Sequence, residues 1–200
     1  DQSTRLRTRY ASADSSSISR VDYAGNNDRF SIQGGATYQD VNLLRIGGDG
    51  RVLPFTAYTS RFADAKIGFM AAEGHELIAS FQYARQPKTP RFDELYPGFG
   101  QTQPTSAEFL FTPQERYFAQ LKYKFDLVTA AFDRGSISIG RQDIVDDRLN
   151  RDFGTVNRDI ESNESELVGF TAQFDKTLGA HYLVYGFERY DDEVTSSRRR

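Results

Sequence analysis

The chain is 200 residues long, has a formal net charge of −3 and contains no cysteine. The missing thiols exclude disulfide frameworks and thiolate metal sites, and the lack of a basic excess argues against a nucleic-acid partner. No apolar run reaches the roughly 18 residues of a membrane-spanning helix, although the alternating strands of a membrane barrel would leave no such run.

Period-two alternation of apolar and polar residues predicts strands from the start of the chain. A strand over 4–10 places Arg5, Arg7 and Arg9 on one face, where they need water or carboxylates opposite them. Further strands are expected around 21–23, at 30–39 and at 63–69. The reversal at 25–28 is short, whereas the glycine-rich segment 44–60 is predicted to be a long loop.

The central segment, 73–125, has the clearest pattern of the chain. A tight turn at Glu73, Gly74 and His75 precedes a strand over 77–84, and a matching strand covers 117–125. Between them, residues 85–114 contain five prolines and two glycines, a density that predicts a long loop rather than a helix or a sheet interior.

The last third of the chain continues the alternation. Strands are expected at 136–140, 168–174 and 183–188, giving about nine strands in all and no helix. The charged segment 143–163 is predicted to be another long loop, the link 176–180 a short one, and the closing 198–200 arginines a solvated loop segment.

The lengths of these connections alternate between short and long, so the long loops would all lie at one end of the sheet. Outer-membrane barrels have this asymmetry, with short periplasmic turns and long extracellular loops. Phenylalanine and tyrosine make up 14% of the chain, and in such a barrel they would form the aromatic girdles at the two membrane interfaces. The predicted fold class is therefore all-β, an antiparallel transmembrane β-barrel in the outer membrane of a Gram-negative bacterium. A complete small porin- or adhesin-type barrel of about eight strands and a soluble β-sandwich binding module remain as alternatives.

The sequence offers no catalytic constellation, and we expect no enzyme activity, no metal site and no cofactor. His75 and His181 fall at predicted short turns and are interpreted as solvated residues, while Asp143, Asp146 and Asp147 are interpreted as an ordinary charged loop. The loop 85–114 is different, because long loops rich in aromatic residues are often functional. The candidate ligand-binding residues are Arg91, Phe92, Tyr96, Phe99 and Gln101; packing of the loop onto the barrel rim is the equally weighted alternative.

Several stretches also resemble one family of membrane proteins. The segment 73–116, with Gln86, Pro90, Arg91, Asp93 and Tyr96 ahead of Pro113, Gln114, Glu115 and Arg116, resembles the early barrel of TonB-dependent outer-membrane receptors. The approach from Gly47 to Tyr58 and the final segment 185–197 are similar to other parts of the same barrel. The resemblance covers nearly the whole chain.

This resemblance implies a barrel of about 22 strands, closed by a plug domain, that imports ferric siderophores, haem or similar nutrients by coupling to the TonB complex. We therefore expect residues 1–200 to be the N-terminal part of the barrel domain, without the plug. The expected partners are outer-membrane lipid and lipopolysaccharide, the TonB complex through the absent plug, and the transported nutrient.

Overall fold

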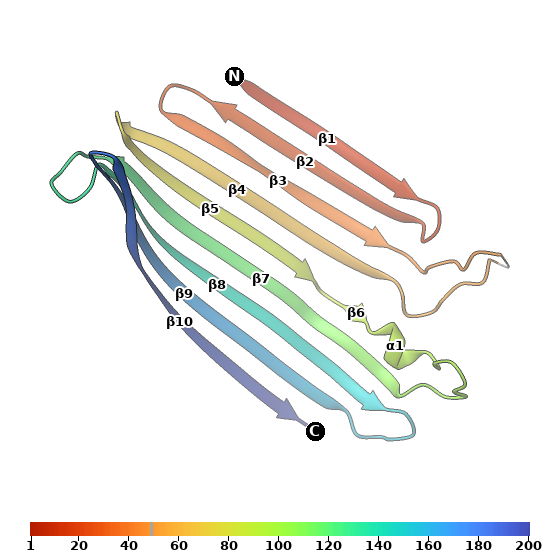
Figure 1. Ribbon diagram of the computed structural model, residues 1–200. Coiled ribbons are helices and arrows are strands. Elements are labelled where there is room, and N and C mark those ends of the chain that lie inside the picture. Colours follow the sequence, from red (N-terminus) through yellow and green to blue (C-terminus); the bar gives the residue numbers. More distant parts are fainter. Residues whose placement is uncertain (49) are drawn as a thin grey trace.

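The computed structural model describes residues 1–48 and 50–200, which form a single antiparallel sheet (Figure 1). Within this part of the chain, nine long strands pair in the order of the sequence: β1 (Gln2–Ala11), β2 (Ser16–Asn26), β3 (Phe30–Val41), β4 (Tyr58–Ala72), β5 (His75–Gln86), β7 (Ser106–Asp126), β8 (Arg134–Asp152), β9 (Asp159–Leu178) and β10 (His181–Arg199). A two-residue strand, β6 (Thr89–Pro90), pairs with β7, and α1 (Phe92–Leu95) is a four-residue helix. The all-β class is confirmed, and each long strand contains one of the nine predicted strands.

The register gives the sheet two chemically different faces. One row of paired residues consists of Leu6, Val21, Ala36, Ala63, Tyr83 and Tyr117. The adjacent row, whose side chains point to the opposite side, consists of Arg5, Asp22, Gly35, Asp64, Gln82 and Phe118. Because side chains alternate along a strand, these rows define an apolar face and a polar face across six strands.

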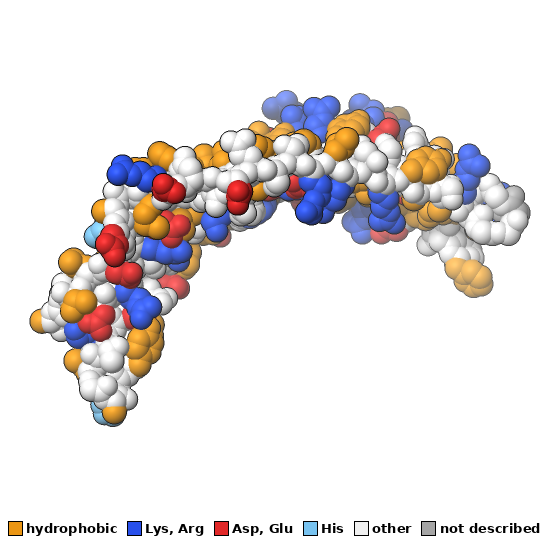
Figure 2. All heavy atoms as spheres, turned by 90° about the horizontal axis from the view of Figure 1, so that it is seen from above, with side chains coloured by type: hydrophobic (Ala, Val, Ile, Leu, Met, Phe, Trp, Pro, Cys, Tyr) orange, Lys and Arg blue, Asp and Glu red, His pale blue; other side chains and the backbone are white. Residues whose placement is uncertain are grey.

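The sheet bends into an open arch, seen along its curvature in Figure 2. Its two edges are β1 and β10, which do not pair with each other. The described residues therefore form neither a closed small barrel nor the two packed sheets of a sandwich, which were the two alternatives left by the sequence.

The connections lie at two ends of the sheet (Figure 1). One end, here called the turn rim, carries the links 27–29, 73–74, 127–133 and 179–180. The other, the loop rim, carries 12–15, 42–57, 87–105 and 153–158. The predicted asymmetry holds for two long connections, 42–57 and 87–105.

The prediction of a third long loop, over 143–163, is wrong. Strand β8 continues to Asp152 and β9 begins at Asp159, which leaves only residues 153–158 as the connection. Both faces of these extensions carry charged residues, so the hydrophobic alternation that marks a strand is absent. Ion pairs across the strands hold the extensions together, including Arg148 with Glu161 at 3.8 Å and Arg151 with Glu108 at 3.2 Å.

The Pro-rich loop is shorter than predicted and contains regular structure. Strand β7 begins at Ser106 rather than near residue 117, and α1 lies within the loop. Pro113 belongs to β7 because the register shifts between Phe111 and Gln114. An irregularity of this kind accommodates a residue that has no amide hydrogen to donate.

Two smaller expectations also change. The closing arginines are not a loop segment: β10 runs to Arg199, and Arg198 and Arg200 both pair with Asp159, at 2.6 and 3.1 Å. His75 lies beside its short turn as expected, but its Nδ1 is 2.7 Å from the Tyr123 hydroxyl, so it is a bonded residue.

Little of the chain is buried, since a single layer covers neither of its faces. The buried apolar side chains of the described residues are Val41, Ile78, Leu95, Phe109 and Phe125. Within 1–48 and 50–200, no helix is long and apolar enough to cross a membrane.

Candidate binding loop and polar face

The loop 87–105 is fastened to the part of β7 that extends toward the loop rim. Strand β6 pairs with Leu110 and Phe111, and Leu95 of α1 is buried. Phe109 is also buried and lies 5.7 Å from Phe111 between ring centroids. The loop therefore has a small apolar core of its own, as compact functional loops commonly do.

Arg91 is the main polar attachment of this loop. Its amide donates to the carbonyl of Phe109 at 3.1 Å, and its guanidinium lies 5.1 Å from the centroid of the same ring. The guanidinium also bonds both carboxylate oxygens of Asp93, at 3.1 and 3.2 Å, and lowers the pKa of that carboxyl. Because the guanidinium already contacts the Phe109 ring and the Asp93 carboxylate, its role is to position the loop and not to bind an anionic ligand.

The aromatic residues of the loop divide into a packed pair and a free tip. Phe92 and Tyr96 stack with centroids 5.1 Å apart, and Tyr96 remains exposed at one edge. Phe99 is fully exposed at the tip of the turn 98–101. Gln101 closes that turn, because its side-chain oxygen accepts a hydrogen bond from the amide of Gly98 at 3.0 Å.

The five predicted binding residues thus lie in one loop but have different local roles. Arg91 and Gln101 make structural contacts within the loop, Phe92 packs against Tyr96, and Phe99 presents its ring to solvent. Their binding of a ligand stays a prediction. The geometry makes Phe99, with the exposed edge of Tyr96, the part of the loop best placed to meet a ligand with apolar or aromatic surface.

A second candidate is a charge network on the polar face of β1 to β4. The Arg20 guanidinium bonds Asp22 at 2.6 Å, Asp64 at 2.8 Å and the Thr37 hydroxyl at 3.2 Å. Arg7 bonds the other oxygen of Asp22 at 2.7 Å. The expectation that the arginines of the first strand need carboxylates opposite them is therefore met for Arg7.

The same face retains positive charge that is not ion-paired. Among the described residues, Arg5 makes no ion pair, and Lys66 is exposed nearby on β4. A hollow beside the network is lined by Arg5, Arg7, Arg20, Asp22 and Asp64, together with small and polar residues. This surface suits an anionic or strongly polar partner.

Sequence analysis did not find the network because it depends on register. Arg20 and Asp22 are two positions apart on one strand, a visible signal, but Asp64 lies 44 positions from Arg20. Only the pairing of β2 with β3 and of β3 with β4 brings Asp64 within reach.

Within residues 1–48 and 50–200, no group of three histidine, aspartate or glutamate side chains is arranged to hold a metal ion. Comparison of the chain with protein-family models and with curated proteins finds no match.

Proposed function

We propose that this chain forms part of the wall of a TonB-dependent receptor barrel, which imports a scarce nutrient such as a ferric siderophore or haem across the bacterial outer membrane. The observation that carries the proposal is the uncovered apolar face of a single-layer sheet. Its large side chains include Leu121 at 49% exposure, Ile139 at 53% and Phe187 at 59%. In water a continuous face of this kind is unfavourable, whereas lipid would cover it.

Aromatic residues lie on the apolar face near both rims. At the turn rim, Phe30 stacks on Phe69 at 4.7 Å, and Tyr123 lies 5.3 Å from Phe125. On the side nearer the loop rim, Tyr83 lies 4.8 Å from Tyr117. The stretch 117–125 of β7 extends about 27 Å along the strand, comparable to the roughly 25 Å apolar band of outer-membrane barrels.

On the same face, charged pairs replace the apolar residues toward the loop rim. Arg85 pairs with Glu115 at 2.9 Å one register step beyond Tyr83 and Tyr117. On β8 and β9 the change begins one step earlier, where Arg141, level with Ala119, pairs with Glu166 at 2.9 Å. Such groups are favourable in the head-group region and in water, and costly in the hydrocarbon layer. Because the longest connections, 42–57 and 87–105, lie at the loop rim, we propose that this rim faces outside the cell and the turn rim faces the periplasm.

The receptor role rests on the family resemblance of the sequence and on the extracellular position that this orientation gives to the loop 87–105. Nutrient would be captured there by Phe99 and Tyr96. The polar face of the barrel wall would line the interior, where the plug of the resembled family sits.

Cysteine labelling in intact cells tests the orientation and the membrane location, since the chain has no native cysteine. We expect a membrane-impermeant maleimide to label Phe99→Cys in intact cells, and Ala180→Cys only after the outer membrane is permeabilised. Labelling of Ala180→Cys alone in intact cells would overturn the orientation, and equal labelling of both in a soluble fraction would overturn the membrane location.

Uptake measurements test the transport role separately. Cells lacking the gene should take up less of at least one compound from a panel of radio-iron-loaded siderophores and haem. The gene-dependent uptake should disappear when a protonophore removes the energy source of the TonB complex. Uptake that is unchanged for the whole panel, or that persists with the protonophore, would contradict this role.

A further inference from the structure

The connection 127–133 is unlike the other links of the turn rim, because it folds back over the apolar face. Phe132 lies 5.7 Å from Phe125 and 5.2 Å from Phe174 between ring centroids, and both partners belong to that face. The Tyr185 hydroxyl donates to the carbonyl of Ala131 at 2.8 Å. The connection therefore extends the aromatic edge of the sheet across β7, β9 and β10.

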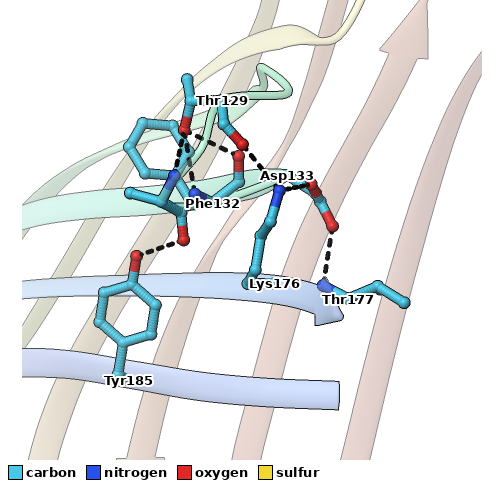
Figure 3. A network of polar contacts seen from close by, with 7 residues as sticks. Thr129, Phe132, Asp133, Lys176, Thr177 and Tyr185 are labelled. Carbon is cyan, nitrogen blue, oxygen red and sulfur yellow. Dashed lines mark hydrogen bonds and ion pairs between the residues drawn. The ribbon is translucent and has the colours of Figure 1, made fainter. Parts of the chain in front are cut away.

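A polar clasp holds the connection in this position (Figure 3). The Lys176 ammonium donates to the carbonyl of Thr129 and to the carboxylate of Asp133, both at 2.7 Å. The other oxygen of Asp133 accepts from the amide of Thr177 at 2.8 Å. Lys176 lies on the apolar-face side of β9, and its side chain is only 13% exposed, so its charge is neutralised where it leaves the sheet.

The backbone of the connection is largely bonded within the protein. The Leu127 amide donates to the Asp133 carbonyl at 3.1 Å, and the Thr129 amide donates to the Phe132 carbonyl at 2.7 Å. The Thr129 hydroxyl oxygen accepts from the amides of Ala131 and Phe132. A segment that enters the lipid interface needs this internal pairing, because the water that would otherwise bond it is scarce there.

The clasped connection exposes two large apolar side chains. Val128 is 80% exposed and Leu127 is 50% exposed. Exposure of these two apolar side chains to water is unfavourable, and the internal bonds of the turn keep them in this position. The connection packs on the apolar face through Phe132, so we infer that its exposed apolar residues share the surroundings of Leu121 and Ile139.

We propose that the connection 127–133 is an interfacial anchor that inserts Val128 and Leu127 among the head groups and upper acyl chains of the periplasmic leaflet. The occupant of this surface is phospholipid. Insertion to a depth of about 5–10 Å would fix the height of β7 to β10 in the membrane, as interfacial helices do in other proteins. The inference rests on the proposed membrane location and adds a specific lipid contact to it.

Single tryptophans can test the anchor, because the chain contains none of its own. The full protein is reconstituted in phosphatidylcholine vesicles that carry bromine at defined acyl positions. Tryptophan emission and its quenching are then measured for Val128→Trp, Val156→Trp and Leu121→Trp, with the unsubstituted protein as the blank. Val156 is the matched control, since it is also an exposed valine in a short connection, at 93% exposure, but lies at the loop rim.

We expect blue-shifted emission from Val128→Trp that is quenched most by bromines close to the head groups. Leu121→Trp should be quenched most by deeper bromines, and Val156→Trp should not be quenched. Quenching of Leu121→Trp without quenching of Val128→Trp would contradict the anchor and leave the membrane location supported. Absence of quenching for Leu121→Trp would contradict both the membrane location and the anchor.

Discussion

The guanidinium of Arg20 lies directly over Gly35 on the neighbouring strand. A Cβ atom added to Gly35 would stand 2.6 Å from a terminal nitrogen of Arg20 and 2.7 Å from the carbonyl oxygen of Val21. The absence of a side chain at Gly35 leaves the space through which Arg20 crosses β3 to reach Asp64. A glycine in a strand interior commonly marks such a close approach.

Replacement of Gly35 by alanine should therefore disturb both the network and the local backbone. The arginine could rotate away, but the Val21 carbonyl could move only with its strand, and crowding of this kind costs about 1–3 kcal/mol. Urea unfolding of the protein in lipid vesicles, followed by tyrosine fluorescence, measures the loss. Gly47→Ala is the matched control, because no atom lies within 4 Å of its added Cβ. Equal midpoints for the two variants would contradict the steric role of Gly35.

The bond between Arg20 and Asp64 should be a modest contributor. Arg20 is 26% and Asp64 45% exposed, so solvent screens their attraction, and pairs of this type contribute about 0.2–1 kcal/mol. A double-mutant cycle with Arg20→Gln and Asp64→Asn isolates this coupling from the bonds that Arg20 makes with Asp22. A coupling near zero would mean that the 2.8 Å contact positions Arg20 without stabilising the fold.

Phe99 should matter for ligand capture and not for stability. Its ring is fully exposed, so Phe99→Ala removes no packing, whereas it removes the apolar tip of the loop. We expect weaker uptake of the transported compound at low concentration, seen as a raised half-saturation concentration, with unchanged unfolding. Arg91→Ala should instead loosen the loop, because it removes the contacts to Phe109 and Asp93, and should increase chymotrypsin cleavage within 87–105 in intact cells. Unchanged uptake by Phe99→Ala would refute the role of the tip.

Alternation was enough to predict the all-β class and the nine long strands, because apolar and polar residues have to face opposite sides of a half-buried sheet. It failed where the two faces do not differ in polarity. From Asp143 onward in β8 both faces carry charged residues, and in the first part of β7 Phe109, Leu110 and Phe111 put apolar side chains on both faces. Ion pairs and backbone bonds hold these stretches, and they have no period in hydropathy.

Predictions for the binding residues had a related limit. The sequence predicts a long aromatic loop over 85–114, and the structure has a shorter one over 87–105. Sequence does not tell which of its rings pack. Phe109 and Phe99 are the same residue type ten positions apart; one is buried under Arg91 and the other fully exposed. The clasp of Lys176 and Asp133, 43 positions apart, likewise becomes visible only once β8 and β9 are paired.

That clasp should respond to acid. The bonds from Lys176 and from the Thr177 amide lower the pKa of Asp133 below its ordinary value of 3.8, and the nearby Arg134 acts in the same direction. A carboxyl whose pKa is lowered in the folded state stabilises that state above its unfolded pKa, and the contribution is lost as the pH falls through the folded pKa. The clasp should thus be complete at neutral pH and open progressively below about pH 4.

The emission of Val128→Trp in vesicles reports this opening directly. Between neutral pH and pH about 2, we expect a red shift and weaker quenching by brominated lipid, as the released turn leaves the interface. In the double variant with Asp133→Asn, the amide cannot titrate, so the emission should be red-shifted already at neutral pH and should show no such transition. An identical acid transition in both variants would assign the titration to another group and remove the clasp as the element that holds the turn on the apolar face.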